Sequence, residues 1–392
     1  MTTKETIDLF NKYVIANYPR LPRVIVRGKG CYCFDADGNK ILDMFPGWAV
    51  SGTGHCHPKV VEAIRKQAGE LLHIDNTFYS EPQGKLAKLL SERAFGGKCF
   101  FCNSGAEANE AAMKLARLHT AKGKYKFITA EGGFHGRTFA TVTATAQPKY
   151  HEGFEPLLPG FIYVPFNDSG ALEEVFDDEV AGVLVEPIQG EGGINIANKE
   201  YLEAIRQLCD ENGALMILDE VQSGIGRTGK WFAYQHYGIE PDIMTMAKAL
   251  GGGVAIGAMM AKEEVAATLT PGKHASTFGG NALACAAGIA VIEAIEEENL
   301  LENANKMGKY AKDKLNGLKG KYSIIEEVRG VGLMIGVQLK GPGSNIVNKC
   351  LENGLRINCT NETVLRFMPP LIVSKSQIDE AIGILDGVLS GS

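Results

Sequence analysis

The sequence lacks the features that mark nucleic-acid-binding and membrane proteins. It has no excess of basic residues, because 46 Asp and Glu outnumber 40 Lys and Arg and give a net charge of −6. No basic stripe is present either, so the charge does not favour nucleic acid or an anionic membrane as a partner. The longest uncharged run, Ala275 to Ile292, contains Ser276, Thr277 and Asn281. It is therefore a poor membrane span and more typical of a buried helix preceded by a loop.

A secretory signal and a metal-binding cysteine pattern are also missing. The first twenty residues hold no apolar signal core, and nine cysteines, an odd number, are typical of reduced thiols in a cytoplasmic protein. Cys99 and Cys102 form a CxxC, but in the strand-like run KCFFC their side chains would point to opposite faces. Since no second pair exists, we expect buried free thiols and no bound metal.

Low-complexity segments, internal repeats and long linkers are absent as well. What remains is a composition of 45% hydrophobic and 22% charged residues, which is typical of a soluble globular protein. A chain of 392 residues exceeds one ordinary hydrophobic core, so we expect a large domain and a smaller one.

Strand-like apolar runs alternate with helical patterns through the middle of the chain. The alternation indicates βαβ units, and it predicts an α/β fold whose mostly parallel, seven-stranded sheet is flanked by helices. The expected strands are Lys98–Cys102, Lys126–Thr129, Phe161–Val164, Gly182–Glu186, Ala214–Leu218, Asp242–Met246 and Ile256–Met260.

The two ends of the chain carry other patterns. Residues 1–20 have the spacing of an amphipathic helix, and an Asp37–Gly38 turn in CYCFDADGNKILDM predicts a hairpin. The tail carries helices and the strand-like runs SIIEEVRG, GLMIGVQL, GLRINC and VLRFMPP, which indicate a smaller α+β domain. We expect an N-terminal arm with part of the small domain (residues 1–57), a large ligand-binding domain (58–285) and a C-terminal small domain (286–392).

Two charged residues follow buried strands in the run from Ala214 to Gly253. Asp219 comes after ALMIL, and Lys248 comes shortly after DIMTM. Open α/β sheets bind ligands beyond the carboxyl ends of their strands, so an acid and an amine presented there indicate a cofactor site. Taken alone, such a pair is more often a structural salt bridge at the end of the sheet.

Small residues suited to an anion follow the first expected strand of the sheet. Ser104, Gly105 and Ala106 form a turn that leads into a helix, where backbone N–H groups and the helix dipole can hold a phosphate. The turn has neither the lysine of a P-loop nor the third glycine of a dinucleotide fingerprint. An ordinary strand-to-helix connection is the alternative.

Three further motifs place polar groups where a ligand could meet them. In GGFHGRT, Phe134 could stack on a planar ring and Arg137 could bind a carboxylate. EPIQGEGG offers Gln189 and Glu191 on a loop after a strand. LRFMPPL puts Arg366 in an otherwise apolar strand, where it needs a partner in the protein or in a ligand.

Taken together, the motifs resemble those of the class III pyridoxal-phosphate (PLP) aminotransferases. The resemblance runs almost from end to end and is greatest to the members that act on N-acetylornithine. It implies a large-domain and small-domain fold with two active sites built across a homodimer, and PLP as the cofactor. The motifs that carry it are FFCNSGAEANEAAMKLAR, FHGRT, EPIQGEGG, LDEVQSGIGRTG, AKALGGG, STFGGNALA and LRFMPPL.

The resemblance implies a role for each cofactor-site residue. Lys248 matches the lysine that holds the cofactor aldehyde and later moves the substrate proton, and Asp219 matches the partner of the pyridine nitrogen. Gln222 would bind the ring oxygen and Phe134 would stack on the ring. The phosphate would be held by Ser104, Gly105 and Ala106, with Thr277 from the other subunit.

The resemblance also implies how the substrates bind. Arg137 would bind the α-carboxylate of the amino donor and the far carboxylate of 2-oxoglutarate, while Arg366 would bind the oxoacid's α-carboxylate. Glu191 would pair with Arg366 during the donor half-reaction and so act as a gate. Further substrate-site candidates are Ser276, Trp48 and Tyr79.

The implied reaction transfers the terminal amino group of N-acetylornithine to 2-oxoglutarate, giving N-acetylglutamate 5-semialdehyde and glutamate in arginine biosynthesis. Several alternatives stay open: the same chemistry on succinylornithine, ornithine, 4-aminobutyrate or an N-acylated lysine, a PLP aminomutase or decarboxylase, and a fold kept only for binding. One methylene or hydroxyl shifts specificity only modestly, so the sequence does not separate the donors.

Overall fold

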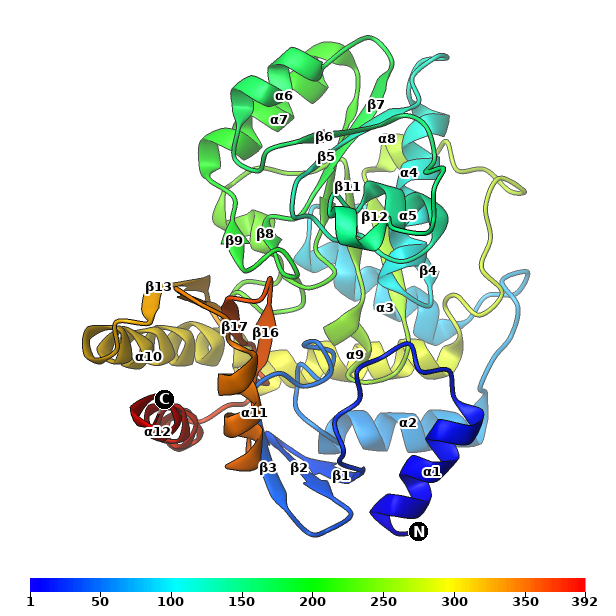
Figure 1. Ribbon diagram of the computed structural model, residues 1–392. Coiled ribbons are helices and arrows are strands. Elements are labelled where there is room, and N and C mark those ends of the chain that lie inside the picture. The colour runs from blue at the N-terminus through cyan, green and yellow to red at the C-terminus, as the bar shows by residue number, and fades with distance from the viewer. Residues whose placement is uncertain (392) are drawn as a thin grey trace.

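The computed structural model, which describes residues 1–391, is built around one large sheet (Figure 1). Its seven strands are β4 (Lys98–Cys102), β5 (Lys126–Ala130), β6 (Phe161–Val164), β7 (Val180–Val185), β10 (Leu215–Asp219), β11 (Ile243–Met246) and β12 (Gly257–Ala261). They lie in the order β4-β12-β11-β10-β7-β5-β6. The neighbours pair in parallel except around β12, which runs antiparallel to β11 and β4. The predicted α/β fold with a mostly parallel seven-stranded sheet is confirmed.

Helices surround this sheet and continue into the lower part of the molecule (Figure 1). The described α-helices are α1 (Thr3–Tyr13), α2 (Pro58–Glu70), α3 (Glu81–Arg93), α4 (Gly105–His119), α5 (Phe139–Ala144), α6 (Ser169–Val175), α7 (Lys199–Asn212), α8 (Glu263–Ala266), α9 (Ala282–Glu297), α10 (Leu300–Lys321), α11 (Ser344–Glu352) and α12 (Lys375–Ser390). Short 3-10 helices are η1 (Pro148–Tyr150), η2 (Ala233–His236) and η3 (Lys248–Gly251).

Alternate residues of β10 show how the sheet is buried on both faces. Leu215 and Ile217 belong to the hydrophobic cluster that includes α4, whereas Met216 and Leu218 belong to the cluster that includes α7. Both faces of the strand are therefore covered, which is why its sequence is apolar from Leu215 to Leu218 and shows no alternation with polar residues.

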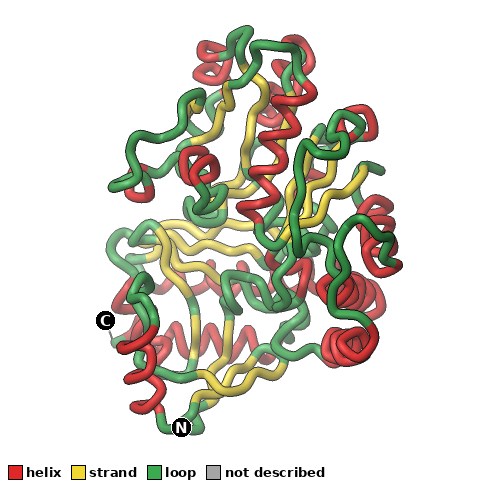
Figure 2. Tube along the Cα trace, turned by 90° about the vertical axis from the view of Figure 1, so that its right-hand side faces the viewer, coloured by secondary structure: helices red, strands yellow, loops and turns green. Residues whose placement is uncertain are grey.

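Two smaller sheets lie below the large one (Figures 1 and 2). The first contains β1 (Ile25–Lys29), β2 (Tyr32–Asp35), β3 (Lys40–Asp43) and β15 (Leu355–Arg356), in that order. The second has the order β13-β14-β17-β16, with bounds β13 (Ile325–Val331), β14 (Met334–Leu339), β16 (Asn358–Thr360) and β17 (Val364–Phe367). A two-stranded ribbon joins β8 (Ile188–Gln189) and β9 (Asn195–Ile196).

The first small sheet joins segments from both ends of the chain. β2 and β3 form the predicted antiparallel hairpin, with Gly38 at φ +88° in its turn. β15 then pairs in parallel with β3, so a strand from beyond residue 350 completes an N-terminal sheet. The domain boundaries at residues 57/58 and 285/286 stay a prediction.

The long uncharged run forms a loop followed by a buried helix, as predicted. α9 has most of its residues buried and packs against α2, α3 and η3. Among residues 1–391, no helix combines the length and apolar character needed to cross a membrane.

Two details of the sequence prediction are wrong. The first helix ends at Tyr13, not near residue 20, because Val14 is extended (φ −116°, ψ 130°) and Pro19 follows, whose missing N–H cannot continue a helix. GLRINC is not one strand, because Leu355–Arg356 pairs with β3 while Asn358–Thr360 pairs with β17. The buried Ile357 lies between the two pairings.

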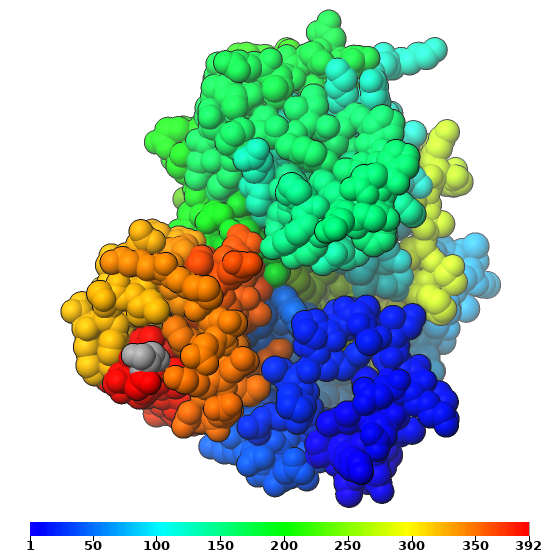
Figure 3. All heavy atoms as spheres, viewed as in Figure 1, coloured from blue at the N-terminus to red at the C-terminus, as the bar shows by residue number. Residues whose placement is uncertain are grey.

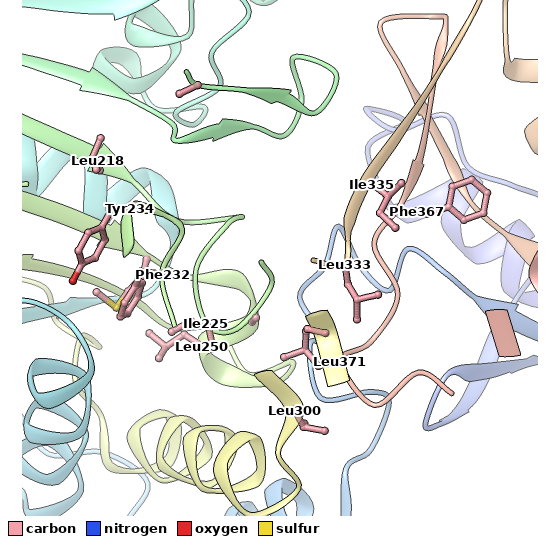
Figure 4. Packing of buried hydrophobic residues seen from close by; sticks show 14 of the residues in the cluster. Leu218, Ile225, Phe232, Tyr234, Leu250, Leu300, Leu333, Ile335, Phe367 and Leu371 are labelled. Atoms are coloured by element: carbon pink, nitrogen blue, oxygen red, sulfur yellow. The ribbon is translucent and has the colours of Figure 1, made fainter. Parts of the chain in front are cut away.

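One hydrophobic cluster connects the large sheet with the C-terminal part of the chain. Figure 4 shows Leu218 and Phe232 on one side, and Ile335 and Phe367 on the other, with Leu300 below them. All five belong to the same buried cluster. This shared core fixes the carboxyl ends of the large sheet relative to β17, which carries Arg366.

Candidate active site

A cavity of about 400 Å³ lies beyond the carboxyl ends of β7, β10 and β11. Figure 3 shows that the green and cyan upper part, which holds these strands, meets the blue and orange lower parts across the middle of the molecule. Of the sequence-predicted site residues, the cavity wall contains Ser104, Gly105, Ala106, Phe134, Glu191, Asp219, Gln222 and Lys248. The structure thus brings together residues spread over nearly 150 positions of sequence.

Lys248 lies at the start of η3, two residues after β11 ends. Its backbone has φ +42°, a conformation that non-glycine residues rarely adopt and that often marks a functional position. Burial lowers the pKa of its amine, while the nearby carboxylates of Glu191, Glu186 and Asp219 act in the opposite direction. The lower pKa favours the neutral amine, which is the form that can act as a nucleophile or accept a proton.

Asp219 is the last residue of β10 and its side chain is buried. Its carboxylate accepts hydrogen bonds from Asn109 Nδ2 (2.8 Å), His135 Nδ1 (2.9 Å) and the Val221 backbone N–H (3.0 Å). Among residues 1–391, the basic side chain within ion-pair distance of the Asp219 carboxylate is that of His135, and Lys248 is not within that distance. The salt bridge between Asp219 and Lys248, which the sequence left open, is therefore not formed.

Asn109 and His135 hold the Asp219 carboxylate in place. Asn109, on α4, also donates to the His135 carbonyl (2.8 Å) and accepts from Thr245 Oγ1 (2.7 Å). The sequence indicates no role for either residue, because an asparagine inside a helix and a histidine in a glycine-rich loop have no signature that identifies their partner.

The first turn of α4 forms the small-residue cradle. Ser104 caps the helix by accepting from the Glu107 N–H (3.2 Å), and the first backbone N–H groups of the helix have no partner within it. A Cβ on Gly105 would lie 2.8 Å from Val221, so only glycine lets the backbone come this close to that loop. Unpaired N–H groups at a helix start suit a phosphate.

Phe134 and Gln222 lie at other walls of the cavity. The Phe134 N–H donates to Glu186 Oε1 (2.9 Å), and its ring meets Tyr150 edge to face at 5.7 Å. Gln222 is buried; its Nε2 donates to Glu191 Oε1 (3.4 Å), and its Oε1 has no hydrogen-bond partner among residues 1–391. A buried amide oxygen without a partner costs free energy unless a ligand supplies one, so this atom fits a polar group bound in the cavity.

Arg366 and Glu191 form a bidentate ion pair in which Glu191 lines the cavity and the buried Arg366 lies behind it, outside the cavity wall. Arg366 Nη1 donates to Glu191 Oε1 (2.7 Å), and Nη2 donates to Oε2 (3.0 Å). Burial alone would raise the pKa of Glu191, but the Arg366 guanidinium outweighs it and holds that pKa below its ordinary value. The pair expected from the sequence is present, and its action as a gate stays a proposal.

Arg137 lies outside the cavity wall, on the exposed side of Phe134. Its guanidinium lies 4.0 Å from the Tyr150 ring centre and 5.5 Å from that of Phe134. Tyr150 is partly buried. Its burial and, to a smaller extent, the negative charge of Glu191 raise the pKa of its hydroxyl. Tyr150 was missed because QPKYHEG carries no motif that distinguishes it from a surface loop.

The structure does not bring four other predicted residues into this cavity. Trp48 is 46% exposed and lines a separate cavity of about 850 Å³ beneath the N-terminal segment. Tyr79 is fully exposed and Thr277 is exposed, while Ser276 Oγ accepts from Asn103 Nδ2 (3.3 Å) beside the phosphate cradle. The roles implied for these residues stay predictions.

Comparisons with known proteins agree with this geometry. The model of the class-III aminotransferase family matches residues 13–389. The acetylornithine aminotransferase of Caldanaerobacter subterraneus is 56% identical over 97% of this chain and 98% of its own length, and that of Methanocaldococcus jannaschii is 54% identical over 100% and 99%. Among solved structures, ornithine aminotransferase from Toxoplasma gondii has a TM-score of 0.95 at 34% identity, covering 100% of this chain and 96% of that one. Acetylornithine aminotransferase from Elizabethkingia anophelis has a TM-score of 0.89 at 33% identity, with both chains fully covered.

Two further carboxyl groups are buried close to Asp219. Burial, the larger cause, and the negative charge of Asp219, the smaller one, raise the pKa of Glu186 to about 7. Burial also raises the pKa of Glu220 to about 7, although its carboxylate accepts from Ser223 Oγ (2.5 Å) and the Tyr234 N–H (2.7 Å). Glu220 does not line the cavity, so it can be changed without removing a cavity group.

The raised pKa of Glu220 makes stability depend on pH. The folded protein holds this proton more tightly than the unfolded chain, so the contribution is complete below pH 4.5 and is lost as the pH rises through about 7. The loss is on the order of 3 kcal/mol. Glu220→Gln removes this titrating group. The free energy of unfolding of the variant, measured in urea and compared with that of the wild type, should therefore be relatively larger at about pH 8 than at about pH 5. If the difference between variant and wild type were the same at both pH values, Glu220 would not titrate in this range.

Proposed function

This chain belongs to the class-III aminotransferases, and from that premise we propose that it transfers the terminal amino group of N-acetylornithine to 2-oxoglutarate. The products are N-acetylglutamate 5-semialdehyde and glutamate, as required for arginine biosynthesis. The chain is a transaminase of a PLP-dependent family. The observation that carries the substrate proposal is the Glu191–Arg366 ion pair, because Glu191 lines the same cavity as Lys248 and a substrate carboxylate can replace it as the partner of Arg366.

The residues that line the cavity suit the chemical groups of PLP. The start of α4 has backbone N–H groups for a phosphate, and Asp219 offers a fixed carboxylate for a protonated ring nitrogen. Gln222 has an unpartnered polar atom for the ring hydroxyl, and Phe134 offers a ring face. Lys248 would hold the aldehyde.

PLP, when bound, accepts the electron pair that remains when the substrate carbon loses its proton. Asp219 keeps the ring nitrogen protonated, because its negative charge favours the cationic form beside it. Once the substrate amine has displaced it from the aldehyde, Lys248 Nζ, with its lowered pKa, would take the proton from the substrate carbon and would return it on the cofactor side. Asn109 and His135 keep Asp219 oriented through the cycle.

Two arginines orient two different substrates. Arg137 binds the α-carboxylate of N-acetylornithine at the far end, which leaves the terminal amine near Lys248. Arg366 binds the α-carboxylate of 2-oxoglutarate after Glu191 leaves it, and Arg137 then takes the second carboxylate. Glu191 masks the Arg366 charge during the donor half-reaction, when no carboxylate is available to do so.

The proposal includes a homodimer in the cytoplasm. Thr277 is exposed and lies outside the cavity of its own subunit, so it is free to approach the phosphate in a second subunit, as the family resemblance implies. Ser276, Trp48 and Tyr79 are assigned to the same shared region. Nine free cysteines fit a reducing compartment.

Comparison of amino donors separates N-acetylornithine from the alternatives. Its kcat/KM should exceed those of ornithine, succinylornithine, 4-aminobutyrate and N-acetyl-lysine by about tenfold or more, since one group in a fitted pocket is worth about that much. Steady-state kinetics with 2-oxoglutarate as common acceptor measures this. A higher value for any of the other four would reassign the donor while leaving the transaminase intact.

The proposed role of Glu191 as a gate is tested by removing its charge. Glu191→Gln keeps the size of the side chain but leaves the buried Arg366 without its counter-charge, so the donor half-reaction should slow by about tenfold or more. The oxoacid half-reaction, in which the substrate supplies the carboxylate, should change by less than about threefold. Stopped-flow absorbance of the bound cofactor follows each half-reaction separately. Equal changes in both would refute the gate.

A further inference from the structure

Arg366 has contacts that do not depend on Glu191. It is 1% exposed. Besides the ion pair, its Nε donates to Asn358 Oδ1 (2.8 Å) and its Nη1 donates to the Gly190 carbonyl (3.0 Å). The Phe45 ring centre lies 4.6 Å from the guanidinium carbon. A buried guanidinium left without partners would be costly, so these contacts decide what Arg366 does when Glu191 is displaced.

Asn358 is placed by the fold to hold the Nε edge of Arg366. It is the residue directly opposite Arg366 in the antiparallel pair of β16 and β17. Side chains of directly opposite residues lie on the same face of a sheet, within reach of one another. With Nε held by Asn358, the two terminal nitrogens of the planar guanidinium are turned toward the carboxylate in the cavity.

The backbone of the Glu191 loop is held by the same hairpin. Thr360 Oγ1 donates to the Glu191 carbonyl (2.7 Å), and Asn361 Nδ2 donates to the Gly192 carbonyl (2.7 Å). Neither bond involves the Glu191 carboxylate. Displacing that carboxylate therefore requires rotation of one side chain, while the loop backbone and the guanidinium can both stay where they are.

We propose that Asn358 is a positioning residue that keeps Arg366 aimed at the cavity when the α-carboxylate of the oxoacid replaces Glu191. The proposal deepens the assignment of Arg366 to the oxoacid and rests on the function proposed above. Asn358 touches neither the substrate nor the cofactor in this account, because it acts through Arg366.

The neutrality of Asn358 is part of its role. An amide oxygen accepts the Nε hydrogen bond without cancelling the positive charge of the guanidinium. A carboxylate at position 358 would keep the hydrogen bond and form a permanent ion pair, so Arg366 would attract an incoming carboxylate less strongly. Asn358→Asp therefore separates geometry from charge, which Asn358→Ala alone cannot do.

The test compares the two variants as PLP-loaded enzymes. Asn358→Ala should raise KM for 2-oxoglutarate about tenfold, the loss expected for one hydrogen bond to a charged group, with kcat changed less than about threefold. Asn358→Asp should raise the same KM at least as much, although its thermal unfolding midpoint stays at or above that of the wild type. In both variants, the donor half-reaction should stay within about twofold of the wild type.

A binding measurement without turnover accompanies the kinetics. Glutarate, a dicarboxylate that cannot accept an amino group, should bind both variants about tenfold more weakly in isothermal titration. Asn353→Ala is the matched control, because Asn353 is an exposed asparagine at the end of α11 whose side chain donates to the Lys349 carbonyl (2.8 Å). This control should match the wild type in every measurement.

Three results would overturn the proposal: equal effects on the two half-reactions, unchanged oxoacid binding in Asn358→Ala, or recovery of wild-type KM in Asn358→Asp. Failure of the proposed donor is distinguishable from all three. It would appear as a wild-type enzyme that uses 2-oxoglutarate but not N-acetylornithine, and the comparison of the Asn358 variants would still be decisive.

Discussion

The bidentate ion pair between Glu191 and Arg366 is the interaction on which the arrangement of the site depends. It connects the loop after β7 of the large sheet with β17 of the C-terminal sheet, and it holds the buried Arg366 beside Glu191, which lines the cavity. A buried guanidinium without a counter-charge is costly, but the carboxylate need not come from the protein. In the proposed reaction, this constraint would let one cavity accept two substrates that differ in the number of their carboxylates.

The other charges of the cavity are kept apart by specific partners. Asp219 has three hydrogen-bond donors, including His135 at ion-pair distance, and Lys248 is not its ion-pair partner. Because burial lowers the pKa of Lys248, the amine is closer to its reactive form than a solvent-exposed lysine would be. The separation of acid and amine is thus as important to the chemistry as their presence.

The sequence predicted the large sheet well because strands covered on both faces are continuous apolar runs between turn residues. The apolar strand around Arg366 indicated only that this arginine needs a partner, and the family resemblance implied that the partner is Glu191. The sequence could not predict Asn109, His135, Tyr150 or Asn358. Their roles come from contacts that no local pattern identifies. Asn109 and His135 meet Asp219 from distant parts of the chain, and Asn358 lies opposite Arg366 across a pair of strands. The predicted helix over residues 1–20 was too long. The spacing of apolar residues continues past Tyr13, but Val14 is extended and Pro19 follows it.

The central claim is that one cavity carries out both halves of an amino transfer, first with an amine and then with an oxoacid. The most direct measurement is the visible absorbance of the PLP-loaded enzyme given each substrate in turn. N-acetylornithine alone should bleach the visible band, and 2-oxoglutarate added after removal of the donor should restore it. A band that bleaches and does not return with 2-oxoglutarate would contradict the account.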